Sequence, residues 1–179
     1  MLMVPSDDAP RFCNAPWLNG VDASVQLAIW QALAVRSEPA RVTLFEQNKP
    51  SRYLWFVIGG SVAVERSRPD GRPEILAELD GPAIYGTTTF FRNSLPTMTL
   101  RATSAIQGWT LDRSSYDRLR VERPAAAEAL ALAVVQVLSE RFDMLDRRLT
   151  TLMASQGDDH RRATEWANFR SRLFEEPAA

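Results

Sequence analysis

The sequence predicts a mainly β fold of the α+β class, an antiparallel β-roll (jelly roll) flanked by helices. Between Thr43 and Ala105, short apolar runs alternate with turn residues every eight to twelve positions, a spacing typical of small antiparallel sandwiches and barrels. One helical pattern precedes this region and a much longer one follows it. The 179 residues suffice for one domain with a tail.

The first predicted helix spans residues 23–36. Asp22 or Ser24 can cap its N-terminus, and Pro39 follows its end. Residues 1–16 are rich in Pro and Asp and predict a flexible lead. We therefore expect the folded domain to cover residues 17–155.

Two glycine-containing turns divide the predicted sheet. Gly59-Gly60 lies between the apolar run Tyr53–Ile58 and the alternating run Val62–Glu65, which predicts a hairpin turn. Pro69-Asp70-Gly71 predicts a second hairpin. Each apolar run should therefore return beside its predecessor.

The long C-terminal helix is predicted to begin at Pro124, a residue that suits the first helical position. The run from Ala125 to about Met153 is rich in Ala and Leu and lacks Gly and Pro. Its apolar residues recur at alternating spacings of four and three, which is a heptad seam: Ala131, Val135, Leu138, Phe142, Leu145, Leu149 and Leu152. Residues 156–179 are predicted to form a C-terminal tail with a weakly amphipathic pattern.

Composition narrows the classes of function. The 21 basic and 22 acidic residues nearly balance, whereas a nucleic-acid-binding domain usually carries a basic stripe, so no direct nucleic-acid partner is expected. A lone histidine, His160, excludes a multi-histidine metal centre. Neither His160 nor Cys13 has an identifiable catalytic partner, so an enzyme is not expected.

The expected location is the cytoplasm. The single cysteine cannot form an intrachain disulfide, and the opening residues are too short and polar for a signal peptide. No apolar run approaches the roughly 20 residues that span a bilayer, so no membrane association is expected.

The front half of the roll carries a recognisable order of motifs. Phe45-Glu46-Gln47-Asn48 is followed by the aromatic run Tyr53–Ile58 and then by Gly60-Ser61-Val62-Ala63-Val64. Over about residues 20–155 this order resembles the cyclic-nucleotide-binding domain of the catabolite activator and kinase regulatory-subunit family. Asn48 stands where that family usually has glycine, and Asn tolerates left-handed backbone angles better than most residues.

The resemblance also locates a phosphate cassette, in which the family uses a glutamate for the ribose and an arginine for the cyclic phosphate. Its first part is Tyr85-Gly86-Thr87, so the glutamate position is Thr87. Its second part places the arginine position at Pro96, or at Thr97 with a gap of one residue. Arg101 falls on the outward parity of its strand and cannot replace it. Ordinary micromolar cAMP binding is therefore not expected.

Two interpretations of the cassette remain open. Its hydroxyls and amides could bind a cyclic nucleotide or another small anion, or its threonines could simply suit strands. No other cofactor is expected. The candidate ligand-binding residues are Tyr85, Gly86, Thr87, Thr88, Thr89, Pro96, Thr97, Met98 and Thr99.

The sequence favours a stand-alone regulatory or sensor module, because too few residues follow the long helix for the family's helix-turn-helix domain. The alternative is a protein-interaction or dimerisation module with an empty pocket, which would act through a protein partner. Either would be a homodimer through the long helix if the helix's other apolar face packs on the roll. The predicted interface residues are Leu138, Phe142, Leu145, Leu149 and Leu152.

Overall fold

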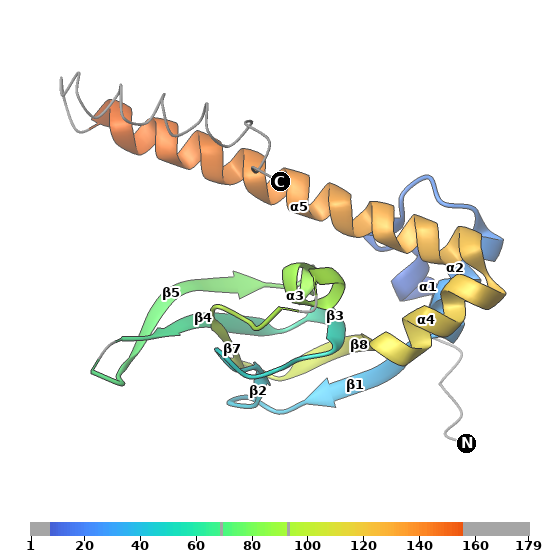
Figure 1. Ribbon diagram of the computed structural model, residues 1–179, viewed down its shortest axis with the longest axis horizontal. Coiled ribbons are helices and arrows are strands. Elements are labelled where there is room, and N and C mark those ends of the chain that lie inside the picture. Colours follow the sequence, from blue (N-terminus) through green and yellow to red (C-terminus); the bar gives the residue numbers. More distant parts are fainter. Residues whose placement is uncertain (1–7, 69, 93, 156–179) are drawn as a thin grey trace, which may run out of the picture. The chain divides into compact units, whose positions relative to one another are not determined.

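The computed structural model describes residues 8–68, 70–92 and 94–155. Its α+β, mainly β architecture confirms the predicted jelly roll, built from two four-stranded antiparallel sheets (Figure 1). Sheet A has the order β1 (Ala34–Glu38), β8 (Ile106–Asp112), β3 (Tyr53–Gly59) and β6 (Ala83–Tyr85). Sheet B has the order β2 (Thr43–Phe45), β7 (Thr99–Ala102), β4 (Ser61–Ser67) and β5 (Pro73–Asp80).

The interior between the sheets is apolar and closely packed. In β3, Trp55 and Val57 point inward, because alternate strand residues share a face. Leu100 and Ala102 of β7 and Val62 of β4 meet them from sheet B. The cluster is completed by Leu44, Phe45, Tyr85 and Ile106.

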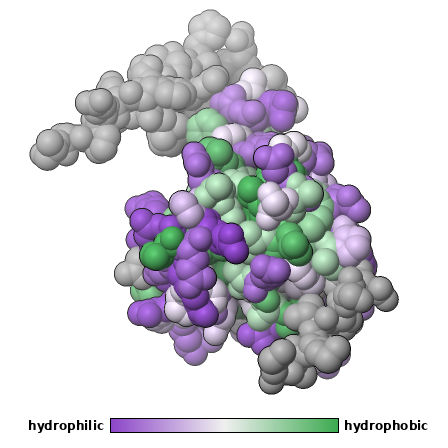
Figure 2. All heavy atoms as spheres, turned by 90° about the vertical axis from the view of Figure 1, so that its right-hand side faces the viewer, coloured by the Kyte–Doolittle hydropathy of each residue, from purple (hydrophilic) through white to green (hydrophobic). Residues whose placement is uncertain are grey.

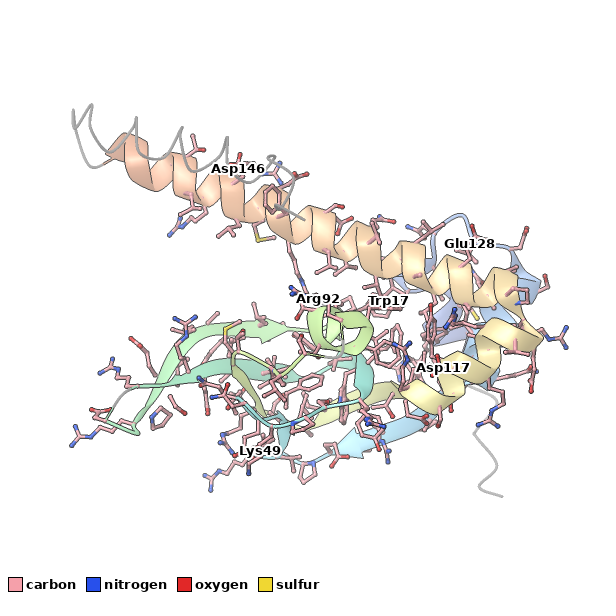
Figure 3. All side chains as sticks on the ribbon, in the orientation of Figure 1. Trp17, Lys49, Arg92, Asp117, Glu128 and Asp146 are labelled. Atoms are coloured by element: carbon pink, nitrogen blue, oxygen red, sulfur yellow. The ribbon has the colours of Figure 1, made fainter. Side chains whose placement is uncertain are left out.

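The other face of sheet A carries a second, aromatic core beneath the N-terminal helices, which are α1 (Asp8–Cys13), the 3-10 helix η1 (Pro16–Leu18) and α2 (Ala23–Gln31). Phe12 lies 5.5 Å from the Phe56 ring and 5.2 Å from the Trp109 ring, centroid to centroid, both in edge contacts. Trp17, labelled in Figure 3, packs on Phe56, and Trp30 packs on Trp109. Phe56 in β3 and Trp109 in β8 alternate along their strands with the residues that point into the roll.

This core corrects the prediction of a flexible lead for residues 8–16, whereas residues 1–7 lie outside the described part of the chain. Residues 8–13 are helical and Phe12 is fully buried, because its ring fills the space over Phe56 and Trp109. The first helix is also shorter than predicted. It ends at Gln31, and Ala34–Glu38 form β1, which pairs with β8. A strand at the edge of sheet A has therefore replaced the predicted last turn of helix.

The Gly59-Gly60 turn is not a hairpin. β3 pairs with β6 and β8 in sheet A, whereas β4 pairs with β5 and β7 in sheet B, so the turn carries the chain from one sheet to the other. The second predicted hairpin is confirmed, because β4 and β5 are antiparallel neighbours on either side of Asp70 and Gly71. Asn48 has a φ of 60°, as its place in the β2–β3 connection predicts.

Helix α4 (Arg113–Glu122) follows β8 directly and is capped by Asp112. The Asp112 carboxylate accepts hydrogen bonds from the backbone N–H of Ser115 and from the hydroxyls of Ser114 and Ser115. Burial alone would raise the pKa of Asp112, but these hydrogen bonds outweigh it and hold the pKa below its usual value.

The face of the molecule at this end carries a hydrophobic area bordered by hydrophilic residues (Figure 2).

Helix α5 runs from Pro124 to Ser155, which confirms the predicted long helix and its first residue. The chain divides into two compact units, one ending at Val137 and one beginning at Leu138, so α5 contributes to both. In the first unit, Ala126, Leu130 and Val134 of α5 are buried. No helix in the described part of the chain has the length and apolar character needed to span a membrane.

Replacing Phe12 by Ala should destabilise the protein by about 3–5 kcal/mol, because it removes a fully buried ring from the aromatic core. Urea unfolding followed by tryptophan fluorescence measures the loss. The matched control is Leu27→Ala on α2, which is 48% exposed and should cost about 1 kcal/mol or less. Equal small effects of both substitutions would show that α1 does not belong to the core.

Candidate ligand-binding site

The first cassette segment lies where β6 passes into the short helix α3 (Thr87–Arg92). Tyr85 ends β6 opposite Trp55, and its side chain belongs to the roll interior. Gly86 has a φ of +84°, and a Cβ built on it would meet the Tyr53 carbonyl oxygen at 2.6 Å and the Phe45 ring at 2.8 Å. Only glycine fits this close approach, so Gly86 fixes where α3 begins.

The threonines of α3 are not an open row of hydroxyls. Thr87 and Thr89 are 4% and 6% exposed, whereas Thr88 is exposed. The hydroxyl of Thr89 donates to the Gly86 carbonyl at 3.2 Å, and the Phe90 N–H donates to the same carbonyl at 2.9 Å. The Thr89 proton therefore holds the first turn of α3 together.

The second cassette segment packs against the connection between β2 and β3. The buried Pro96 accepts a hydrogen bond from the Asn48 N–H at 2.9 Å, and the Thr99 hydroxyl accepts one from the Gln47 N–H at 3.0 Å. Thr97 and Met98 are exposed. The two segments thus meet the same stretch of chain, since Gly86 lies on Phe45.

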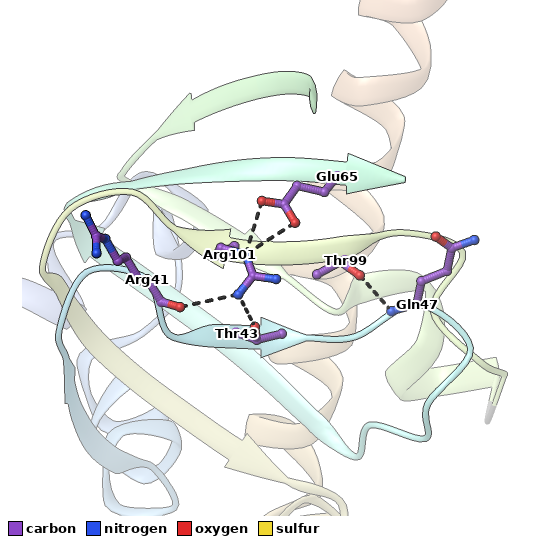
Figure 4. A network of polar contacts seen from close by, with 6 residues as sticks. All are labelled: Arg41, Thr43, Gln47, Glu65, Thr99 and Arg101. Atoms are coloured by element: carbon purple, nitrogen blue, oxygen red, sulfur yellow. Dashed lines mark hydrogen bonds and ion pairs between the residues drawn. The ribbon is translucent and has the colours of Figure 1, made fainter. Parts of the chain in front are cut away.

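Arg101 is engaged elsewhere, as its parity indicates. Leu100 and Ala102 point into the roll, so Arg101 lies on the opposite face of sheet B (Figure 4). Its Nε donates to both carboxylate oxygens of Glu65, at 3.1 and 3.3 Å, and another of its nitrogens donates to the Thr43 hydroxyl at 2.9 Å. This network ties β2, β7 and β4 together and occupies the guanidinium.

The sequence did not indicate that Trp55 places a polar group, its indole N–H, in the roll interior. Its side chain is 7% exposed, and its indole N–H finds no hydrogen-bond acceptor within the described residues. The alternation of β3 could have indicated its direction, but not that its N–H would lack an acceptor.

The described residues offer little for metal or nucleophilic chemistry. They contain no group of three or more His, Cys, Asp or Glu side chains placed to hold a metal ion. Burial raises the pKa of the Cys13 thiol, which lowers its thiolate fraction at neutral pH.

The fold and the match to a family model define the class of protein. Residues 35–123 match the family model of the cyclic nucleotide-binding domain, and this part of the chain belongs to that family. A curated relative, the CRP-like cAMP-activated global transcriptional regulator of Mycobacterium tuberculosis, is 25% identical over 134 residues. The match covers 75% of this chain but only 58% of the relative, so the chain spans less than two thirds of that regulator.

Solved structures share the fold. A cyclic nucleotide-binding domain from Methylobacillus flagellatus superposes with a TM-score of 0.66 and 19% identity, over 73% of this chain and 74% of that one. The regulatory subunit of a cAMP-independent protein kinase A from Trypanosoma brucei has a TM-score of 0.59 and 19% identity, over 75% of this chain and 45% of that one.

Gly86→Ala should destabilise the protein by about 3 kcal/mol or more, because it adds a clash with the Tyr53 backbone to a left-handed conformation. Gly71→Ala is the matched control, since Gly71 has a φ of +79° with nothing within 4 Å of its added Cβ. It should lose only about 1–2 kcal/mol. Chemical denaturation gives both values, and equal losses would contradict the close approach at Gly86.

Proposed function

We propose that this chain is a dimeric regulatory module with a cyclic nucleotide-binding fold that binds cAMP and cGMP weakly or not at all. One observation carries the proposal: the positions that hold the family's glutamate and arginine are Thr87 and Pro96 or Thr97, none of which ionises. A cyclic phosphate at this place would meet amides and hydroxyls but no cassette cation.

The arginine nearest in sequence to the second cassette segment, Arg101, does not supply the missing charge. Arg101 is held by Glu65 and Thr43 on the far face of its sheet. Each hydrogen bond to a charged group contributes about 1.5–3 kcal/mol, so losing the arginine alone weakens binding by roughly one or two decades. The fold by itself does not decide the ligand, since it occurs both in a cAMP-activated regulator and in a cAMP-independent kinase subunit.

Any ligand of the roll should contact Gly86–Thr89 and Thr97–Thr99, the two segments that pack on the β2–β3 connection. An anion there would be held by backbone amides and by the exposed hydroxyls of Thr88 and Thr97. Binding would signal through α5. The chain's role would be regulatory and not catalytic, as the name of its curated relative suggests.

The dissociation constants of cAMP and cGMP should exceed about 10 μM in isothermal titration calorimetry. The reason is that the cassette positions for the phosphate and the ribose hydroxyl carry no ionisable side chain, and ~10 μM corresponds to about −7 kcal/mol. Tighter binding of either nucleotide would overturn the proposal.

A variant carrying Thr87→Glu and Thr97→Arg tests whether the missing charges cause the weak binding of cyclic nucleotides. If charge loss alone weakens binding, restoring both groups should tighten cAMP binding at least about tenfold. Unchanged affinity in a folded variant would show that the pocket is closed for another reason.

The second candidate function is an interaction module with an empty pocket. It is favoured by the commitment of the Thr89 hydroxyl to Gly86 and of the Thr99 hydroxyl to Gln47, which stabilises the fold without any ligand. A protein of this kind should bind none of the nucleotides, yet keep its dimer surface.

The dimer surface would be the heptad seam of α5. Phe142 and Leu145 are 49% and 55% exposed, and Val135, earlier in the same seam, is 56% exposed. Leu138 and Leu149 are partly buried, and the side chain of Leu152 lies outside the described ones. Leu130 and Val134, on another side of α5, are already buried in the first unit. An apolar stripe of this length needs a cover, and a second copy provides one with matching periodicity.

Phe142→Glu with Leu149→Glu should convert the dimer into a folded monomer, because both charges enter the seam. Size-exclusion chromatography with light scattering measures the mass, and circular dichroism checks the fold. Arg147→Glu with Thr150→Glu, two exposed positions outside the seam, is the matched control and should leave the dimer intact. A wild type that is monomeric at tens of micromolar would refute the dimer.

A further inference from the structure

A groove that touches the cassette only at Thr89 lies between the β2–β3 connection, α3 and the start of α4. It has two arms that share Ser51, Arg52 and Arg113. The larger arm has a volume of about 790 Å³ and runs along β2, past Lys49 and Asp117, both labelled in Figure 3. The smaller arm has a volume of about 300 Å³, the lower end of the range for small-molecule sites.

The smaller arm is cationic. Its lining consists of Ser51, Arg52, Thr89, Phe90, Phe91 and Arg113, with no acidic residue among them. The larger arm, by contrast, contains both acidic and basic residues, and Lys49 is paired with Glu46 at 2.8 Å. An anion would therefore enter the smaller arm.

The two arginines of the smaller arm differ in their engagement. Arg113 is fixed: it donates to the Phe90 carbonyl at 3.1 Å, pairs with Asp117 at 3.3 Å, and lies 5.6 Å from the Tyr116 ring centroid. Arg52 is exposed, and within the part of the chain that the structure describes its guanidinium enters no ion pair or hydrogen bond. Arg52 thus has its donors available for a ligand.

The aromatic side chains that line the smaller arm, Phe90 and Phe91, favour a ligand that also carries an apolar group. Phe90 is 3% exposed, whereas Phe91 is only partly buried, and the two rings meet edge to face at 5.1 Å between centroids. A flat apolar group attached to an anion can pack on this wall while its charge reaches the arginines.

We infer that the smaller arm binds a small phosphomonoester that carries an apolar or aromatic group. The phosphate accepts hydrogen bonds from Arg52 and Ser51 and faces the fixed charge of Arg113, and the apolar group lies on Phe91. The small volume favours a free metabolite over a peptide segment. This site shares only Thr89 with the cassette, and its test reads out Arg52 and Phe91, which lie outside the cassette, so the test does not depend on whether the roll binds a nucleotide.

Phenyl phosphate is the probe, followed by two-dimensional amide and arginine side-chain NMR of the full chain. We expect saturable shifts at Arg52, Arg113 and Phe91, weaker shifts with inorganic phosphate, and loss of affinity at high salt. Arg52→Gln should weaken binding at least about tenfold, a change that leaves the fold intact because Arg52 is exposed.

Arg66→Gln is the matched control, because Arg66 is an exposed arginine on β4 that does not line the smaller arm. Its affinity for phenyl phosphate should equal that of the wild type. Equal losses in both variants, shifts outside the arm, or no saturation up to about 10 mM would overturn the assignment. Tighter binding of a phosphotyrosine peptide than of phenyl phosphate would overturn the small-molecule identity of the ligand.

Discussion

The close approach of Gly86 to Tyr53 and Phe45 is the constraint on which the rest of the site depends. A Cβ at Gly86 would collide with a backbone oxygen, so the chain can leave β6 and start α3 at this point only with glycine. The Gly86 carbonyl then receives the Thr89 hydroxyl and the Phe90 N–H. The direction of α3 is therefore set by a contact inside the roll and not by the six residues of the helix.

The strands and the long helix were predictable because their signals are local. Alternation and turn residues located β3, β4 and β5, and Pro124 marked the start of α5. The helical part of the lead was not predictable, because Phe12 is held by Phe56 and Trp109, residues more than forty positions away. The role of Gly60 was missed for the same reason: whether a glycine closes a hairpin or crosses between sheets depends on which strands pair.

For the site, the identities of residues could be predicted but their partners could not. The missing glutamate and arginine follow from Thr87 and Pro96 as the sequence stands. That the Thr99 hydroxyl accepts from the Gln47 N–H, and that Arg101 binds Glu65, depends on strand register across sheet B. That the Thr89 hydroxyl bonds the Gly86 carbonyl depends on where α3 begins. The meeting of Arg52 with Arg113 joins positions 61 residues apart, which share no periodicity. Helical or strand patterns carry no information about such pairs.

Helix α3 connects the two parts of the molecule that can meet an anion. Its first residues follow Gly86 in the cassette, and its Phe90 carbonyl holds Arg113 at the start of α4. A phosphate on the Arg52 side draws on charges fixed by α4, whereas one in the cassette meets only neutral donors. Because an ion pair or charge-assisted hydrogen bond is stronger than a neutral one, the Arg52 side should bind a phosphate more tightly than the cassette. A cassette that kept its arginine would show the reverse order of affinities. A displacement of α3 by either ligand would be felt at the other, since the same short helix forms a wall of both.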